Sequence, residues 1–228
     1  MKTMSIIFIP GLLCDERVWS PIYNVLSDSC HCYIASWENG DTVPAFIERV
    51  LNMSPGKIYI FGHAMGGMLA LLIALYAPER VGGLCIVNSS ADADSPDERE
   101  SRINMMKAYQ LYDDLSLVEE FAKKTTLKPS QIALSMMLSN HDRLISQQCF
   151  LLHRSLSLEK LHNILCPVLL VHSEFDNIKN HNHSKHMHDH LPNSVLKTIN
   201  NSGHMTPIEQ PMYLIQIIKR WITEHHFL

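Results

Sequence analysis

The chain has no long apolar run and no excess of basic residues. Of its 228 residues, 46% are hydrophobic and 18% are charged, and the formal net charge is −4. This balance provides no basic field for a nucleic acid and no polybasic patch for a membrane surface. No stretch reaches the roughly 20 apolar residues of a membrane-spanning helix. The sequence therefore predicts one soluble globular domain, 1–228, with a single core.

We also expect no targeting segment. Lys2 is the only positively charged residue before the apolar run 4–13, and no small-residue cleavage site follows this run. A core strand therefore explains the run better than a signal peptide. The cysteines are expected as free thiols, which suits a reducing cytoplasm. There are six of them: Cys14, Cys30, Cys32, Cys85, Cys149 and Cys166. We therefore expect a cytoplasmic protein.

A side-chain nucleophile is missing at position 64. The motif Gly62-His63-Ala64-Met65-Gly66-Gly67 follows an apolar, β-branched run at 57–62 and opens a helical run at 65–77, which Pro78 ends. A strand, a tight turn and a helix built on Gly-x-Ser-x-Gly form a nucleophile elbow, which strains the central residue and projects its side chain above a sheet. Ala64 holds the nucleophile position but has no group that attacks. Taken alone, the motif also fits an ordinary glycine-containing turn.

Two later segments supply the partners that such an elbow needs. The expected strand 166–172 leads into Asp176, and the expected strand 195–200 leads into His204. A histidine on a loop after the last strand suits a general base, and Asp176 would orient it. Along the chain, the nucleophile position comes first, the acid second and the base third. Asp92, which follows the expected strand 81–88, is the alternative acid.

With these residues in view, the chain resembles the α/β-hydrolases over nearly its full length. The segment Pro10-Gly11-Leu12-Leu13-Cys14-Asp15, with Trp19, is similar to the opening of small bacterial members of that superfamily known as esterases. Many relatives have a histidine where this chain has Pro10. The resemblance implies that the backbone N–H groups of Leu12 and Met65 form the oxyanion hole. It also implies that Leu13 belongs to the substrate-binding region.

Ala64 has two explanations. Drift in a natural pseudoenzyme would be expected to alter the acid, the base or the glycines as well, and all of these are present. We therefore interpret Ala64 as an engineered replacement of a native serine, with a natural non-catalytic binder as the alternative. In either case the chain with Ala64 is expected to be nearly inactive, because only binding and the oxyanion hole remain.

The expected elements alternate between strands and helices, which predicts an α/β fold with a mostly parallel sheet covered by helices on both faces. The expected strands are 4–9, 31–37, 57–63, 81–88, 166–172 and 195–200, and the expected helices are 19–28, 43–53, 65–77, 179–191 and 207–225. Residues 92–159 interrupt this alternation with helical patterns at 97–112, 116–125, 129–138 and 141–154, where α/β-hydrolases insert a helical cap. Met136 and Met137 in this cap are assigned to substrate binding, with packing on the core as the alternative.

The histidine-rich segment 181–190 could place His183, His186 and His190 on one helical face. A closed set of metal ligands is not evident, so we interpret the segment as a solvated helix and expect no metal site and no cofactor.

The sequence predicts a serine hydrolase, acting on a small to medium acyl ester or on a thioester, free or carrier-bound, through a Ser-His-Asp acyl-enzyme in the form with serine at position 64. A natural ligand-binding pseudo-hydrolase and a C–C hydrolase or lyase of the same fold are the alternatives. Neither nucleic acid nor a membrane is expected as a partner.

Overall fold

The computed structural model describes residues 4–112 and 115–227. Within these ranges the strands form one six-stranded parallel sheet in the order β2-β1-β3-β4-β5-β6. The strands are β1 (Ser5–Ile9), β2 (His31–Ile34), β3 (Ile58–His63), β4 (Val81–Val87), β5 (Val168–Ser173) and β6 (Ser194–Ile199). The predicted parallel α/β architecture is confirmed.

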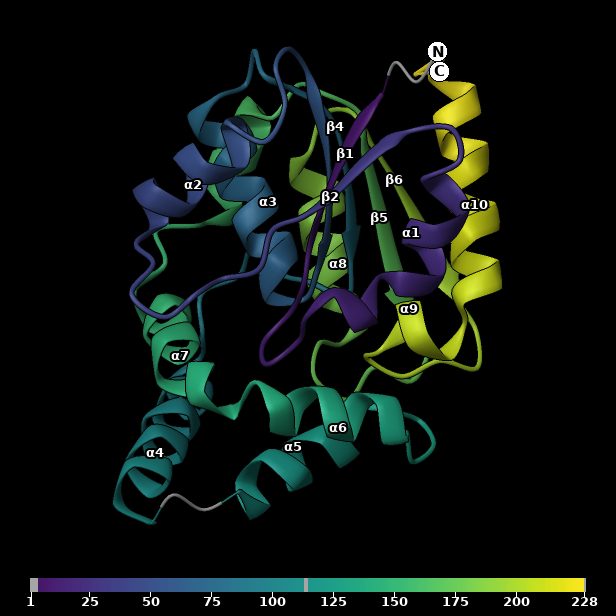
Figure 1. The fold of residues 1–228 in the computed structure, drawn as a ribbon. Coiled ribbons are helices and arrows are strands. Elements are labelled where there is room, and N and C mark those ends of the chain that lie inside the picture. Colours follow the sequence, from purple (N-terminus) through teal and green to yellow (C-terminus); the bar gives the residue numbers. More distant parts are fainter. Residues whose placement is uncertain (1–3, 113–114, 228) are drawn as a thin grey trace.

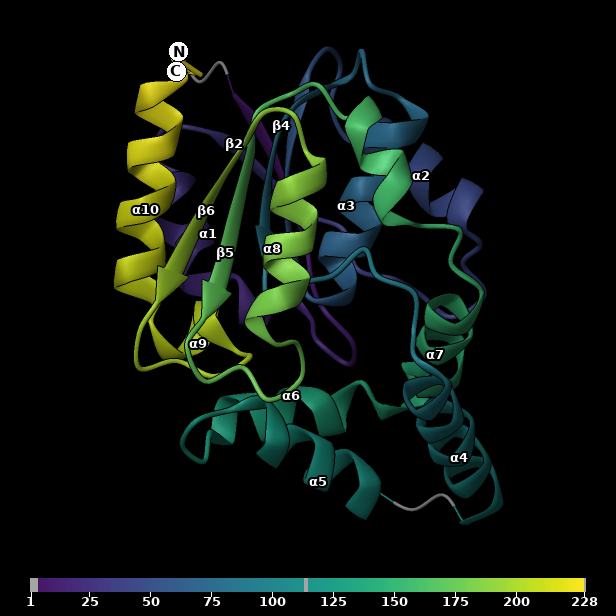
Figure 2. The ribbon, with the colours of Figure 1, turned by 180° about the vertical axis from the view of Figure 1, so that it is seen from behind.

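Helices cover both faces of this sheet (Figures 1 and 2). One face is covered by α1 (Ser20–Leu26) and α10 (Pro211–Glu224), and the other by α2 (Val43–Leu51), α3 (Met65–Tyr76) and α8 (His181–His190). Because both faces are covered, the residues of β1 and β5 are buried throughout, which explains their continuous apolar runs.

Short helical turns complete the core domain. They are η1 (Glu16–Val18), η3 (Leu158–Asn163) and α9 (Thr206–Glu209). No helix in the described ranges is long and apolar enough to cross a membrane.

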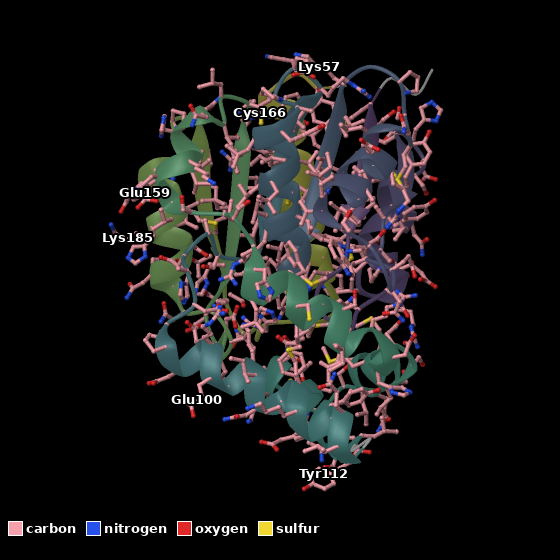
Figure 3. All side chains as sticks on the ribbon, turned by 90° about the vertical axis from the view of Figure 1, so that its left-hand side faces the viewer. Lys57, Glu100, Tyr112, Glu159, Cys166 and Lys185 are labelled. Atoms are coloured by element: carbon pink, nitrogen blue, oxygen red, sulfur yellow. The ribbon has the colours of Figure 1, made fainter. Side chains whose placement is uncertain are left out.

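Among the described residues, four α-helices are inserted between β4 and β5, in the stretch predicted as a cap, and they lie across the carboxyl ends of the strands (Figure 1). They are α4 (Pro96–Tyr112), α5 (Ser116–Thr125), α6 (Gln131–Ser139) and α7 (Leu144–His153), with the turn η2 (His141–Arg143) between the last two. Helix α6 begins two residues later than expected, because the Ser130 side chain caps it by accepting a hydrogen bond from the Ala133 N–H. Figure 3 shows Glu100 and Tyr112 of α4 at the end of the molecule opposite Lys57 and Cys166.

A buried ion cluster ties the start of the cap to its end. The Asp94 carboxylate is 2.8 Å from Nε of Arg102 and 2.9 Å from a terminal nitrogen of Arg154. Burial alone would raise the pKa of Asp94, but the hydrogen bonds and charges of the two arginines outweigh it and lower this pKa to about 2. Asp94 is therefore ionised and joins the segment before α4 to the segment after α7.

Replacing Asp94 with asparagine should destabilise the protein strongly. The change leaves two guanidinium groups without their carboxylate, one of them buried, and breaking a buried pair in this way costs about 3 kcal/mol or more. Urea unfolding measures the loss. Glu100→Gln, on the exposed side of α4, is the matched control and should change the free energy of unfolding by less than about 0.5 kcal/mol. Equal effects of the two changes would contradict a structural role for the cluster.

Candidate active site

Ala64 occupies a strained turn between β3 and α3. Its φ of 50° and ψ of −115° lie in a region that residues other than glycine rarely adopt. Hydrogen bonds hold both backbone polar groups of Ala64. Its N–H donates to the Val87 carbonyl at 2.9 Å, and Ser89 Oγ donates to its carbonyl at 2.7 Å. A strained residue at a tight turn between a strand and a helix is the backbone geometry of a nucleophile elbow.

The glycines beside Ala64 are required by close packing. A Cβ on Gly66 would lie against the Ile9 carbonyl of β1, and a Cβ on Gly62 would lie against the backbone of Gly66 itself. The strand and the helix that flank the turn therefore approach each other more closely than any side chain allows. These contacts explain why the motif has glycine at both positions.

His204 and Asp176 form a buried pair beside the elbow. Nδ1–H of His204 donates to Asp176 Oδ2 at 2.8 Å, and the two side chains are 5% and 0% exposed. The other carboxylate oxygen accepts from the N–H groups of Ile178 and Lys179 at 2.8 and 2.9 Å. Burial opposes ionisation of Asp176, but His204 and these N–H donors outweigh it and lower its pKa. The ionised carboxylate fixes the tautomer of His204 and leaves Nε2 to accept a proton.

Asn88 and His63 fix the backbone of His204. Asn88 Nδ2 and His63 Nε2 both donate to the His204 carbonyl at 2.8 Å. Asn88 also donates to the Thr206 hydroxyl at 2.8 Å and accepts from the Ser173 N–H at 3.0 Å. Sequence reasoning missed Asn88, although a polar residue directly after a buried strand, at the edge that carries Asp176 and His204, is a signal for such a role.

His63 is buried and neutral. Burial, together with the nearby charge of His204, lowers the pKa of His63 from its usual 6.5 to about 3. Within the described residues its Nδ1 has no hydrogen-bond partner, which fits a neutral ring that donates only through Nε2. His63 therefore supports the loop that carries His204.

The neutral state of His63 predicts a loss of stability in acid. As the pH falls through 6.5 the unfolded chain protonates this histidine, whereas the folded protein does so only near pH 3. The unfolded state therefore binds more protons in this window, and stability falls as the pH falls. Between pH 6.5 and pH 4.5 the protein should lose about 2 kcal/mol more than its His63→Gln variant. Urea unfolding at the two pH values checks this, and parallel losses would contradict it.

The backbone N–H groups of Leu12 and Met65 are available to a ligand. Both residues line one cavity together with Ala64 and His204, and neither N–H donates to an acceptor among the described residues. Leu12 belongs to the loop after β1, and Met65 is the first residue of α3. Two N–H groups without an acceptor, on one cavity beside position 64, would suit an oxyanion hole.

The cavity of about 450 Å³ lies between the elbow and the cap, and its wall is mainly apolar. Its apolar lining consists of Leu12, Ala64, Met65, Met68, Met105, Phe121, Leu151 and Ile178. Leu13, Met136 and Met137 are buried but lie outside this lining, so the structure does not bring these three predicted substrate-binding residues to the cavity. They pack in the hydrophobic core instead, and Met105 of α4 is the cap methionine that faces the cavity.

The histidine-rich helix α8 contacts Asp92 through two of its histidines. His183 and His186 place Nδ1 2.7 and 3.0 Å from the two oxygens of Asp92, and His190 donates to the His186 carbonyl. Asp92 therefore has partners other than His204, which favours Asp176 over Asp92 as the acid. Residues 4–112 and 115–227 contain no group of three or more His, Cys, Asp or Glu side chains that could hold a metal ion.

The chain is similar to known proteins over most of its length. The profile of the alpha/beta hydrolase family matches residues 6–216. The chain belongs to this family. A Haemophilus influenzae protein with the provisional name esterase/lipase is 26% identical to it, over 99% of this chain and 85% of the relative. The pimeloyl-[acyl-carrier protein] methyl ester esterase of Vibrio campbellii is 29% identical over 69% of this chain and 67% of the relative.

Solved structures agree on the fold. A thermophilic esterase from Thermogutta terrifontis, with malate bound, superposes with a TM-score of 0.86 at 22% identity, covering 99% of this chain and 91% of that chain. At this identity the superposition shows the fold alone. The names of the relatives, esterases and hydrolases, support a hydrolase.

Proposed function

We propose that this hydrolase, in the form with serine at position 64, cleaves small to medium carboxylic esters or thioesters through an acyl-enzyme. The observation that carries the proposal is a convergence. The His204–Asp176 pair, the free N–H groups of Leu12 and Met65, and the strained residue 64 all meet at one apolar cavity.

The chemistry would run in two steps. Nε2 of His204 takes the proton of the serine hydroxyl, and the serine oxygen attacks the carbonyl carbon. The N–H groups of Leu12 and Met65 stabilise the negative oxygen that forms. His204 then gives its proton to the leaving alcohol or thiol, and a water activated by the same histidine releases the acid. His204 returns the proton taken from this water to the serine oxygen, which restores the starting state, so the cycle requires no cofactor.

The cavity volume and its apolar wall favour an acyl chain of modest length. The Vibrio campbellii relative is named for a carrier-bound methyl ester, and a carrier-bound ester is therefore included in the proposed substrate class. Cys14, Cys85, Cys149 and Cys166 form no disulfide within the described residues, which supports a cytoplasmic location.

A natural non-catalytic binder is the second candidate, and Ala64 itself favours it. The codon at position 64 of the encoding gene separates the two. A serine codon identifies Ala64 as an engineered exchange, and an alanine codon favours the binder.

Burst kinetics test the two-step mechanism. The Ala64→Ser variant, mixed with p-nitrophenyl butyrate, should release nitrophenol in a rapid phase equal to the enzyme concentration, followed by slower turnover. The chain with Ala64 should show no such phase. A folded serine variant that releases no nitrophenol with any activated ester would contradict the proposal.

Acyl-chain preference should depend on Met105. In the serine variant, Met105→Trp fills part of the cavity and should lower kcat/KM for the longest accepted p-nitrophenyl esters by about tenfold or more, while the acetate is nearly unaffected. Met106→Trp, one residue along α4 and outside the lining, is the matched control. An unchanged profile with Met105→Trp would mean that the chain is bound elsewhere.

A further inference from the structure

The loop that carries the oxyanion donor Leu12 has an unusual backbone at the next residue. Leu13 has a φ of 56°, in the left-handed region that favours glycine, and its side chain is buried. A non-glycine residue keeps this conformation only where its surroundings hold it. Because Leu12 and Leu13 share a peptide, the orientation of Leu13 also sets the direction of the loop at Leu12.

The cap supplies the contact that holds Leu13. Its N–H donates to Oε1 of Gln147 at 2.7 Å, across 134 residues of sequence. Gln147 lies on α7 and is 1% exposed, so water does not replace this acceptor readily. The amide must present its oxygen to the loop, because a backbone N–H can only donate.

A second contact ties the same loop to the cap. Nδ2 of Asn140, at the end of α6, donates to Asp15 Oδ2 at 2.8 Å and to the Met136 carbonyl at 2.8 Å. The loop from Leu12 to Asp15 is thus attached to α6 and α7 at two points. Of these, the Gln147 contact is the one next to the oxyanion donor.

We propose that Gln147 is a positioning residue for the oxyanion hole: through the Leu13 N–H it fixes the loop so that the Leu12 N–H faces the cavity. The proposal rests on the proposed hydrolase function. Without this acceptor a buried N–H is left unpaired, and the loop gains stability by turning Leu13 toward another partner. The Leu12 N–H then leaves the position at which negative charge develops.

Kinetics of the Ala64→Ser protein test this assignment. Gln147→Met keeps the length of the side chain and removes the acceptor. It should lower kcat by about 10- to 100-fold with KM within about twofold, because an oxyanion donor acts in the transition state. Gln147→Glu keeps an acceptor oxygen and should restore most of kcat. Should Gln147→Met fail to fold, Gln147→Asn, which is one methylene too short to reach Leu13, takes its place.

A matched control is available one residue away. Ser146 Oγ accepts from Trp37 Nε1 at 2.9 Å, so Ser146→Ala removes a hydrogen bond between α7 and the core without touching the loop. It should leave kcat within about twofold. If Ser146→Ala lowers kcat as much as Gln147→Met, or if a folded Gln147 variant without the acceptor keeps the parent kcat, Gln147 merely anchors the cap and the proposal is overturned.

Amide hydrogen exchange in the chain with Ala64 separates this proposal from the hydrolase function. The Leu13 N–H should exchange slowly, and about tenfold or more faster in Gln147→Met, but not in Ser146→Ala. Persistent protection of Leu13 in Gln147→Met would overturn the proposal even if the serine variant is active. Lost protection together with an inactive serine variant would uphold the contact and contradict only the proposed function.

Discussion

Replacing Ala64 by serine is expected to raise kcat on p-nitrophenyl acetate by about 10⁵- to 10⁶-fold, since loss of the nucleophile in a serine protease costs about that much. The added oxygen would stand at the strained turn, on the cavity that His204 also lines, and no other part of the site has to change. Initial rates of nitrophenol release by the two proteins, at equal concentration, measure the gain.

The control for this gain is removal of the base. In the serine variant, His204→Ala should return the rate to within about tenfold of the Ala64 chain, because residues of one catalytic unit lose most of their effect together. A high rate that survives this change would assign hydrolysis to a contaminant or to another nucleophile. A folded serine variant as slow as the present chain would remove the enzymatic interpretation.

In the serine variant, Asp176→Asn should lower kcat by about 10⁴-fold, as the same change does in serine proteases. An asparagine can present an N–H to Nδ1 of His204, which favours the tautomer with its proton on Nε2, and that tautomer cannot accept the serine proton. Steady-state rates near neutral pH measure the loss.

Asp92→Asn is the matched control for Asp176. Asp92 contacts His183 and His186 and not His204, so its replacement should leave kcat within about threefold. The opposite pattern, a large loss with Asp92→Asn and normal turnover with Asp176→Asn, would transfer the role of the acid to Asp92.

Local patterns predicted much of this molecule. The turn at Ala64 needs glycines at fixed neighbouring positions, and buried parallel strands need continuous apolar runs, so both features are visible in a single sequence. Asp176 and His204 could be proposed as a pair because each follows a strand, and the carboxyl ends of parallel strands share one edge of a sheet.

Contacts between distant segments could not be predicted in this way. Gln147 meets Leu13 only because α7 is folded over the loop after β1, and no spacing in the sequence encodes that contact. The cap methionines show the same limit. Met105, Met136 and Met137 are equally apolar, and only the packing of α4 and α6 decides that the first faces the cavity and the other two face the core.

The most direct test of the account is covalent labelling with a small fluorophosphonate. This reagent reports a nucleophile, a base and an oxyanion hole acting together, without requiring the right substrate. Intact mass and peptide mapping of the Ala64→Ser protein should show a single phosphonyl group, attached to residue 64, and none on the Ala64 chain or on the serine variant with His204→Ala. A folded Ala64→Ser protein that remains unlabelled would contradict the assignment of this cavity as a serine hydrolase active site.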